Sequence, residues 1–201
     1  MSRKAWYIVA VLTFCQTLAI ADRYLLAVST EQLKAEMLLT DAQLGLLMGP
    51  VFLCFYSLFA VPMGLYADSI SRRNLIGVGV LVWSAATGAI AFADNFKTLI
   101  AARMLVGVGE ACLLPAAMSL IAACFPPHRV AKATSVFSLG GSMGKITAFI
   151  GGAALYALLA KQSLGHWALF GVSAWRAVFI YAAIFGGLLF LLLLTVSEPK
   201  R

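Results

Sequence analysis

The sequence has 201 residues, of which 62% are hydrophobic and only 11% charged, and its mean hydropathy is +0.95. A soluble domain carries roughly 25% charged residues, so this composition excludes a soluble globular protein and indicates an integral membrane protein. The net charge of +7 does not indicate a nucleic-acid partner, because the basic residues lie mostly in short segments between apolar stretches.

Six apolar stretches are long enough to cross a bilayer, which takes about 20 residues. Because the connecting segments are short, we expect one all-α bundle over residues 1–201. Lysine and arginine are concentrated in the segments on one side of this arrangement, so the positive-inside rule places both termini in the cytoplasm, with the bundle in the plasma membrane. The predicted spans are 6–28, 42–66, 74–93, 98–124, 132–160 and 174–196.

The first stretch allows a second interpretation. Arg3 and Lys4, the apolar run that follows, and the A-x-A pattern at 19–21 are also typical of a cleaved signal peptide. The apolar character resumes over 24–28, however, which makes the stretch long enough for a full span.

The fourth stretch carries two charges, Arg103 and Glu110, within an otherwise apolar run. They are two helical turns apart and therefore project from nearly the same face, which also carries Gly107. A charge in the middle of a bilayer costs roughly 2.5–3.5 kcal/mol, so such residues usually face a bundle interior or a watery cavity. This favours a functional polar face, with a structural ion pair between helices as the alternative.

Asp22 in the first span and Arg103 in the fourth are predicted to lie at similar depth. Asp22 is about 9 Å below the outer end of its helix, and Arg103 follows five residues after the start of its own. Since each charge is costly alone, we expect a contact between them, direct or through water. Arg23 is the less favoured partner in this region, because it points about 100° away from Asp22 and its side chain can extend outward.

The fifth span contains Lys145 near the centre of the membrane, after Gly140 and Gly144 in a G-x-x-x-G pattern that permits close helix packing. Glu110 lies at a similar depth on the fourth span. We therefore expect Glu110 and Lys145 to line a central cavity. Lys145 either pairs with Glu110 or receives an anionic group of a substrate.

The segment between the second and third spans holds Gly64, Asp68, Arg72 and Arg73. Gly64 permits close helix approach, and the two arginines anchor a cytoplasmic turn. A carboxylate at the C-terminal end of a helix opposes the helix dipole. Asp68 should therefore be held by a positive group such as Arg72, Arg129 or the N-terminus of another helix.

The pattern G-x-x-x-D-x-x-S-R-R in this loop resembles the cytoplasmic signature of the major facilitator superfamily, although Ser69 and Ser71 depart from it. The run from Arg103 to Ala111, R-x-x-x-G-x-G-E-A, is similar to the fourth-helix motif of that superfamily. The segment 197–201, SEPKR, resembles the one that closes its first six helices. The resemblance implies six helices arranged as two inverted three-helix repeats, which form half of a twelve-helix fold.

Within the superfamily, Asp22-Arg23-Tyr24 together with the G-x-G-E-A run of the fourth span is most similar to the spinster branch. That resemblance implies proton-coupled transport of a small organic or amphipathic solute, with lipid-like and anionic solutes among the candidates. Asp22 and Arg103 would then form the proton-coupling pair, and the loop residues with Arg129 the cytoplasmic gate. The other half would be a second six-helix unit or a second copy of the chain.

An alternative from another class is a non-transporting membrane sensor or accessory subunit, in which the buried charges clamp helices together. An enzyme is not expected, because no H-E-x-x-H or G-x-S-x-G pattern occurs. No cofactor, metal or nucleic-acid partner is predicted, and the expected partners are a small-molecule substrate, protons and the lipid bilayer.

Overall fold

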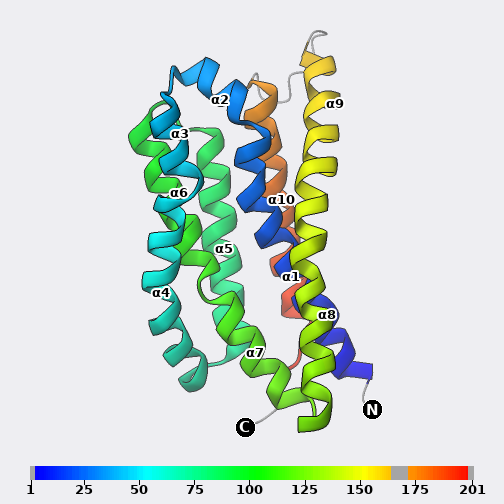
Figure 1. Ribbon diagram of the computed structural model, residues 1–201. Helices are drawn as coiled ribbons and strands as arrows, with labels where there is room; N and C mark the ends of the chain where they lie inside the picture. The colour runs from blue at the N-terminus through cyan, green and yellow to red at the C-terminus, as the bar shows by residue number, and fades with distance from the viewer. Residues whose placement is uncertain (1–2, 164–171, 199–201) are drawn as a thin grey trace.

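The computed structural model describes residues 3–163 and 172–198, except for the side chains of residues 68, 162 and 163. In this part of the chain all regular structure is helical. Figure 1 shows long helices running roughly antiparallel, with both termini at one end of the bundle and α2 at the other. The elements are α1 (Arg3–Val28), α2 (Thr30–Met37), α3 (Asp41–Met48), α4 (Pro50–Ser69), α5 (Arg72–Ala91), α6 (Phe96–Glu110), α7 (Leu113–Cys124), α8 (Pro127–Ile146), the π-helix η1 (Thr147–Gly152), α9 (Ala153–Ser163) and α10 (Ala174–Leu194).

Six helical segments are long and apolar enough to cross a membrane, and each overlaps one of the predicted stretches. The predicted all-α fold class is therefore confirmed. The fifth segment begins earlier than expected, because Pro127 occupies the first turn of α8, where its missing N–H costs nothing. The six segments are Arg3–Val28, Asp41–Ala67, Arg72–Ala91, Phe96–Cys124, Pro127–Lys161 and Ala174–Leu194.

Two of these segments are interrupted in the middle. The second divides into α3 and α4 at Gly49, just before Pro50, and the fourth divides into α6 and α7 after Glu110. Proline cannot donate a backbone hydrogen bond, so the Gly49-Pro50 pair leaves carbonyl groups of α3 without helical partners. One of these carbonyls, that of Leu47, is used by a buried side chain described below.

The central helix α1 packs closely on α8 through two glycines. A Cβ atom at Gly140 would lie 2.6 Å from the carbonyl oxygen of Thr13, and one at Gly144 would lie 2.5 Å from that of Thr17. Only glycine permits this approach of the two backbones, as the G-x-x-x-G pattern predicted. Directly after this contact the helix widens into η1, a local π-helical turn of the kind that is frequent at functional sites.

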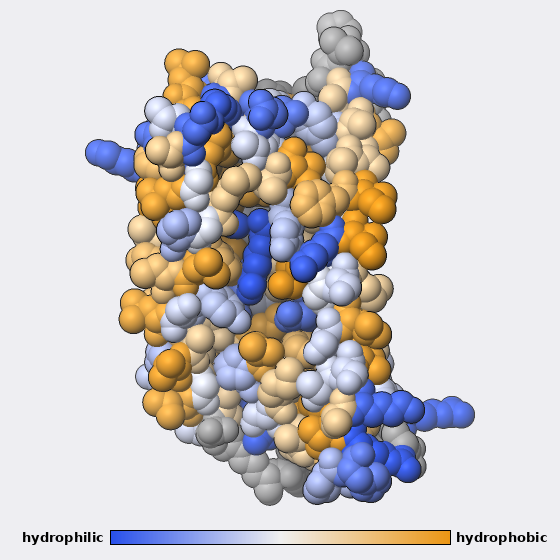
Figure 2. All heavy atoms as spheres, in the orientation of Figure 1, coloured by the Kyte–Doolittle hydropathy of each residue, from blue (hydrophilic) through white to orange (hydrophobic). Residues whose placement is uncertain are grey.

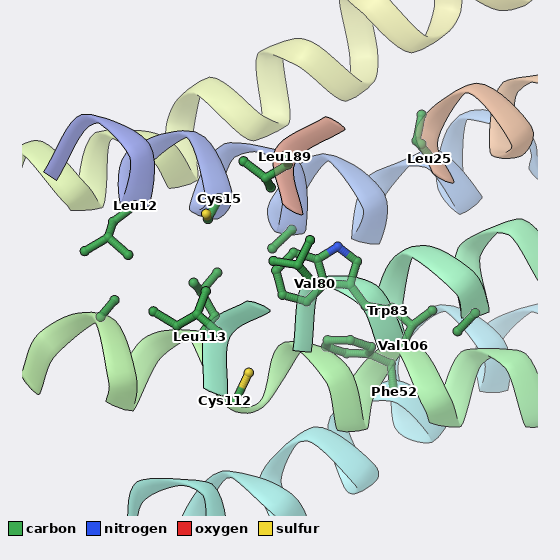
Figure 3. Packing of buried hydrophobic residues seen from close by; sticks show 14 of the residues in the cluster. Leu12, Cys15, Leu25, Phe52, Val80, Trp83, Val106, Cys112, Leu113 and Leu189 are labelled. Carbon is green, nitrogen blue, oxygen red and sulfur yellow. The ribbon is translucent and has the colours of Figure 1, made fainter. Parts of the chain in front are cut away.

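The helix α5 and the segment formed by α6 and α7 are the most buried of the six long segments. Trp83 and Val80 are 2% and 0% exposed. Figure 3 shows both side chains between α1 and α10 on one side and α6 on the other. A Cβ atom at Gly109 would lie 2.7 Å from the backbone nitrogen of Trp83, so α6 also depends on a glycine for its contact with α5.

At the end of the bundle opposite the termini, Glu36 of α2 holds the start of α10. Its carboxylate accepts hydrogen bonds from Trp175 Nε1 at 2.5 Å and from Arg176 Nε at 2.8 Å. Burial alone would raise the pKa of Glu36, but these hydrogen bonds outweigh it and hold the pKa below its usual value. The carboxylate is therefore charged at neutral pH and fixes α2 against the bundle.

We predict that Gly144→Ala destabilises the protein and that Gly141→Ala does not. The added Cβ at residue 144 would force α1 and α8 apart, and overpacking of this kind costs about 1–3 kcal/mol. A Cβ at residue 141 meets nothing within 4 Å. Thermal unfolding in detergent micelles should show a lower midpoint for the first variant only. Equal midpoints would mean that the close packing of the two helices is not required.

Candidate functional site

Four charged residues lie together in the apolar middle of the bundle. α1 contributes Asp22 and Arg23, and α6 contributes Arg103 and Glu110. Asp22, Arg103 and Glu110 are only 7%, 2% and 1% exposed. The two carboxylates and two guanidinium groups have a net charge of zero. This balance lowers the free-energy cost of holding the four charges away from water.

Glu110 pairs with Arg23 and not with Lys145. Arg23 Nε donates to Glu110 Oε2 at 2.6 Å, and the Glu110 side chain is fully buried while that of Arg23 is 26% exposed. Of the two alternatives expected for Lys145, the pairing with Glu110 is therefore wrong, and the contact with an anionic group of a substrate stays a prediction. Depth along the helices placed the two residues at one level, but it did not fix the direction in which each side chain points.

Asp22 and Arg103 make no direct contact in the described part of the chain, so the direct form of the expected contact is wrong, while a contact through water stays a prediction. Asp22 Oδ2 accepts a hydrogen bond of 2.5 Å from the hydroxyl of Thr87 on α5. Arg103 instead donates to two carbonyl oxygens, from Nε to Leu47 at 3.3 Å and from Nη2 to Arg23 at 3.1 Å. The charges of Arg103 and Glu110 act on Asp22 only at longer range.

The different surroundings of Asp22 and Arg23 follow from their adjacency on one helix. Neighbouring residues on an α-helix point about 100° apart. Because Arg23 reaches Glu110 on α6, Asp22 is turned to α5. The carbonyl of Leu47 is available to Arg103 because it belongs to the last turn of α3, where carbonyl groups lack helical partners.

Two aromatic rings of α4 complete this site, and sequence reasoning missed them. The Arg23 guanidinium lies 4.6 Å from the ring centre of Phe52 and 4.8 Å from that of Tyr56, and Arg103 lies 5.2 Å from Phe52. A cation over an aromatic face is stabilised by about 2 kcal/mol when it is desolvated. The spacing of four residues between Phe52 and Tyr56, which puts both on one helix face, was the signal that could have revealed them.

These residues adjoin a polar region that we call the cation face and define by Arg23 and Lys145, which reach the surface, and by the buried Arg103, which lines the adjoining cavity. Figure 2 shows hydrophilic atoms gathered there, with hydrophobic atoms above and below. Lys145 is exposed, and its Nζ lies 6.0 Å from the ring centre of Tyr24. A cavity of about 330 Å³ lies beside this face. It is lined by Arg23, Tyr24, Ala27, Met48, Phe52, Leu53 and Arg103.

The loop between α4 and α5 holds the chain that follows α10. The Ser71 hydroxyl donates to Glu198 Oε2 at 2.5 Å, and the backbone N–H of Arg72 donates to Oε1 at 3.0 Å. Arg73 Nη1 donates to the carbonyl of Val196 at 3.2 Å. Burial would raise the pKa of Glu198, but these hydrogen bonds and the charge of Arg72 lower it below its usual value.

The remaining residues of the expected gate are placed as follows. Gly64 of α4 faces α7, but a Cβ there would make only an ordinary contact of 3.8 Å with Pro115 Cβ, so the expected close approach at this glycine is not observed. Arg129 lies in the first turn of α8, with its backbone N–H bonded to the carbonyl of Pro126 at 2.8 Å. The side chain of Asp68 and residues 199–201 lie outside the described part of the chain.

Residues 12–201 match the model of the Major Facilitator Superfamily. The chain belongs to this family of membrane transporters, and its six helices form half of the facilitator fold. The D-xylose-proton symporter shares the fold with a TM-score of 0.74 at 17% identity, covering 98% of this chain and 49% of that one.

Spinster proteins are among the relatives, as the motifs indicated. The chain is 29% identical to the sphingosine-1-phosphate transporter SPNS2 of Danio rerio over 95% of its own length and 36% of that protein. It is 30% identical to protein spinster homolog 1 of Homo sapiens over 96% of its own length and 35% of that protein. A bacterial homolog of the human lysosomal transporter spinster, solved inward-facing and unoccupied, matches with a TM-score of 0.91 and 34% identity. That match covers the whole of this chain and 45% of that one.

We predict that double-mutant cycles will distinguish the two partners proposed for Glu110. Glu110→Gln combined with Arg23→Gln should show a coupling free energy of at least about 1 kcal/mol, because the two charges are in contact. The matched cycle of Glu110→Gln with Lys145→Gln should be additive within about 0.5 kcal/mol. Both are measured from unfolding midpoints in detergent micelles. Coupling in the second cycle and additivity in the first would contradict the observed pairing.

Proposed function

We propose that the chain contributes six helices to a proton-coupled secondary transporter that moves an anionic or amphipathic organic solute by alternating access. The other half of the translocation pathway would come from a second six-helix unit or a second copy of the chain. The proposal places the protein in the plasma membrane with both termini in the cytoplasm. The observation that carries it is the group of four charges in the middle of a facilitator bundle, of which Asp22, Arg103 and Glu110 are buried and Arg23 is half-buried.

The proton-coupling role is assigned to Asp22 together with Arg103. Asp22 lies outside the pair of Arg23 and Glu110 and is held by a single neutral partner, Thr87. Within the described part of the chain, the Arg103 side chain donates hydrogen bonds only to neutral carbonyl groups, so its charge is balanced through space by the nearby carboxylates. Protonation of Asp22 removes one negative charge from this balance. The loss of this negative charge favours one of the two conformations of the alternating-access cycle over the other.

The substrate class is inferred from the cation face and its surroundings. Arg23, Arg103 and Lys145 provide three positive charges, and the one carboxylate bonded to them, Glu110, is fully buried. An anionic group would be attracted to this face, while Met48 and Leu53 offer apolar contact to an attached chain. Two relatives are named as transporters of anions, sphingosine-1-phosphate and D-galactonate, which is consistent with this inference. In this scheme Glu110 positions Arg23, and Lys145 contacts the substrate.

The cytoplasmic gate is assigned to Gly64, Asp68, Arg72, Arg73 and Arg129. The contacts of Ser71, Arg72 and Arg73 with the segment after α10 tie together two helix ends at the end of the bundle that carries the termini. Rearrangement there would open or close access from that side, as in the rocking motion of related transporters.

The proposal predicts that Asp22→Asn abolishes proton-driven uptake while leaving expression intact. The amide cannot exchange a proton, so an imposed proton gradient should no longer drive accumulation. Labelled sphingosine-1-phosphate and D-galactonate are the probes, in proteoliposomes with and without the gradient. Asp94→Asn, which neutralises an 86% exposed carboxylate, is the control and should accumulate the transported probe like the unmodified protein.

Gradient-driven accumulation that survives in Asp22→Asn would show that the coupling assignment is wrong. A protein that transports neither probe, and that shows no proton flux with either, would favour the sensor or accessory subunit.

A further inference from the structure

A second cavity lies on a different side of α1 from the cation face. It has a volume of about 210 Å³ and is enclosed by α1, α5, η1, α9 and α10. Arg23, Arg103 and Lys145 do not line it. Three of its lining residues, Thr147 and Gly151 of η1 and Phe185 of α10, are exposed, so the cavity is open to the outside of the bundle on that side. A molecule dissolved in the bilayer therefore has a route into it.

Glycines make this cavity possible. Gly151, Gly152 and Gly186 are all on its wall. A Cβ at Gly152 would lie 2.9 Å from Leu25 Cδ2, and one at Gly186 would overlap the side chain of Ser84. A Cβ at Gly151 would meet only Thr147 Cγ2, at 3.8 Å, so a larger side chain at that position would extend into open space.

Asp22 is the only charged residue among the described residues that line the cavity. Asp22 is only 7% exposed, and its Oδ2 accepts a hydrogen bond from the Thr87 hydroxyl. No hydrogen bond to its other oxygen, Oδ1, is made within the described part of the chain. The remaining wall consists of aliphatic and aromatic side chains, glycines, and the hydroxyl-bearing Thr147 and Tyr181. A carboxylate with a free acceptor thus faces an otherwise apolar chamber.

We propose that this cavity binds a small hydrophobic amine, with its ammonium group against Asp22 and its hydrocarbon part between α5, η1 and α10. A charged hydrogen bond to the carboxylate would satisfy Oδ1, and the apolar walls would bury the rest of the ligand. An apolar cavity of 150 Å³ in another protein holds benzene, so a chamber of about 210 Å³ accommodates a phenyl ring with a short alkylamine. This site is separate from the proposed substrate pathway.

The test uses 2-phenylethylamine as the probe, with 2-phenylethanol and 3-phenylpropionate as its neutral and anionic analogues. Binding to the purified chain in lipid nanodiscs is measured by isothermal titration calorimetry, with empty nanodiscs as the blank. The amine should bind and the anion should not. Asp22→Asn should weaken amine binding at least about tenfold, which corresponds to 1.4 kcal/mol, and leave binding of the alcohol unchanged.

A matched pair of leucine substitutions tests the location. Gly151→Leu fills the cavity without a backbone clash and should abolish binding, while Gly141→Leu, on α8 and outside the cavity wall, should not. Unfolding midpoints confirm that both variants are folded. The proposal is overturned if the amine does not bind, if amine and alcohol bind equally well, or if Gly151→Leu binds like the unmodified chain. Because the titration requires no transport, failure of the proposed transport function would leave this result unaffected.

Discussion

The ion pair between Arg23 and Glu110 is the contact on which the arrangement of the site depends. Each charge alone would cost roughly 2.5–3.5 kcal/mol in the middle of a bilayer. Their pairing at 2.6 Å offsets part of that cost and joins α1 to α6. It also sets the rotation of α1. With Arg23 directed to α6, Asp22 must face α5. The two neighbouring residues therefore line separate compartments, Arg23 the cavity beside the cation face and Asp22 the second cavity.

The two compartments differ in chemistry. The cation face carries arginine, lysine and aromatic rings, which suits an anionic solute. The second cavity is apolar with one carboxylate, which suits a hydrophobic cation. Both depend on close helix packing at glycines. A Cβ at Gly107 would lie 2.9 Å from the carbonyl oxygen of Phe52, so glycine at that position lets α4 bring its aromatic rings against the arginines.

Much of the fold could be predicted from the sequence, because apolar length and charge distribution in a membrane protein leave few alternatives. The six spans, the close-packing face formed by Gly140 and Gly144, and the family resemblance all followed from local patterns, but the pattern did not show that α1 is the helix that packs there. The interruption at Gly49-Pro50 was treated as a tolerated proline, although it frees the carbonyl of Leu47 that binds Arg103. Local patterns do not show which long-range partner uses such a group.

The pairing of the buried charges could not be predicted for a related reason. Counting residues gives the depth of a side chain but not its direction around the helix axis. The direct contact of Asp22 with Arg103 and the pairing of Glu110 with Lys145 were therefore expected from depth alone, and the structure shows other direct partners for Asp22, Arg103 and Glu110. Thr87 was missed because one threonine in an apolar span is common, and its role depends on the packing of α5 against α1.

The central claim is that Asp22, and not Glu110, exchanges the coupling proton, because Glu110 is already neutralised by Arg23. Infrared difference spectroscopy of the protein in membranes during a pH jump tests this most directly, since a protonated carboxylic acid has its own carbonyl band. The account predicts that this band is lost in Asp22→Asn and retained in Glu110→Gln. A band that persists in Asp22→Asn and disappears in Glu110→Gln would contradict it.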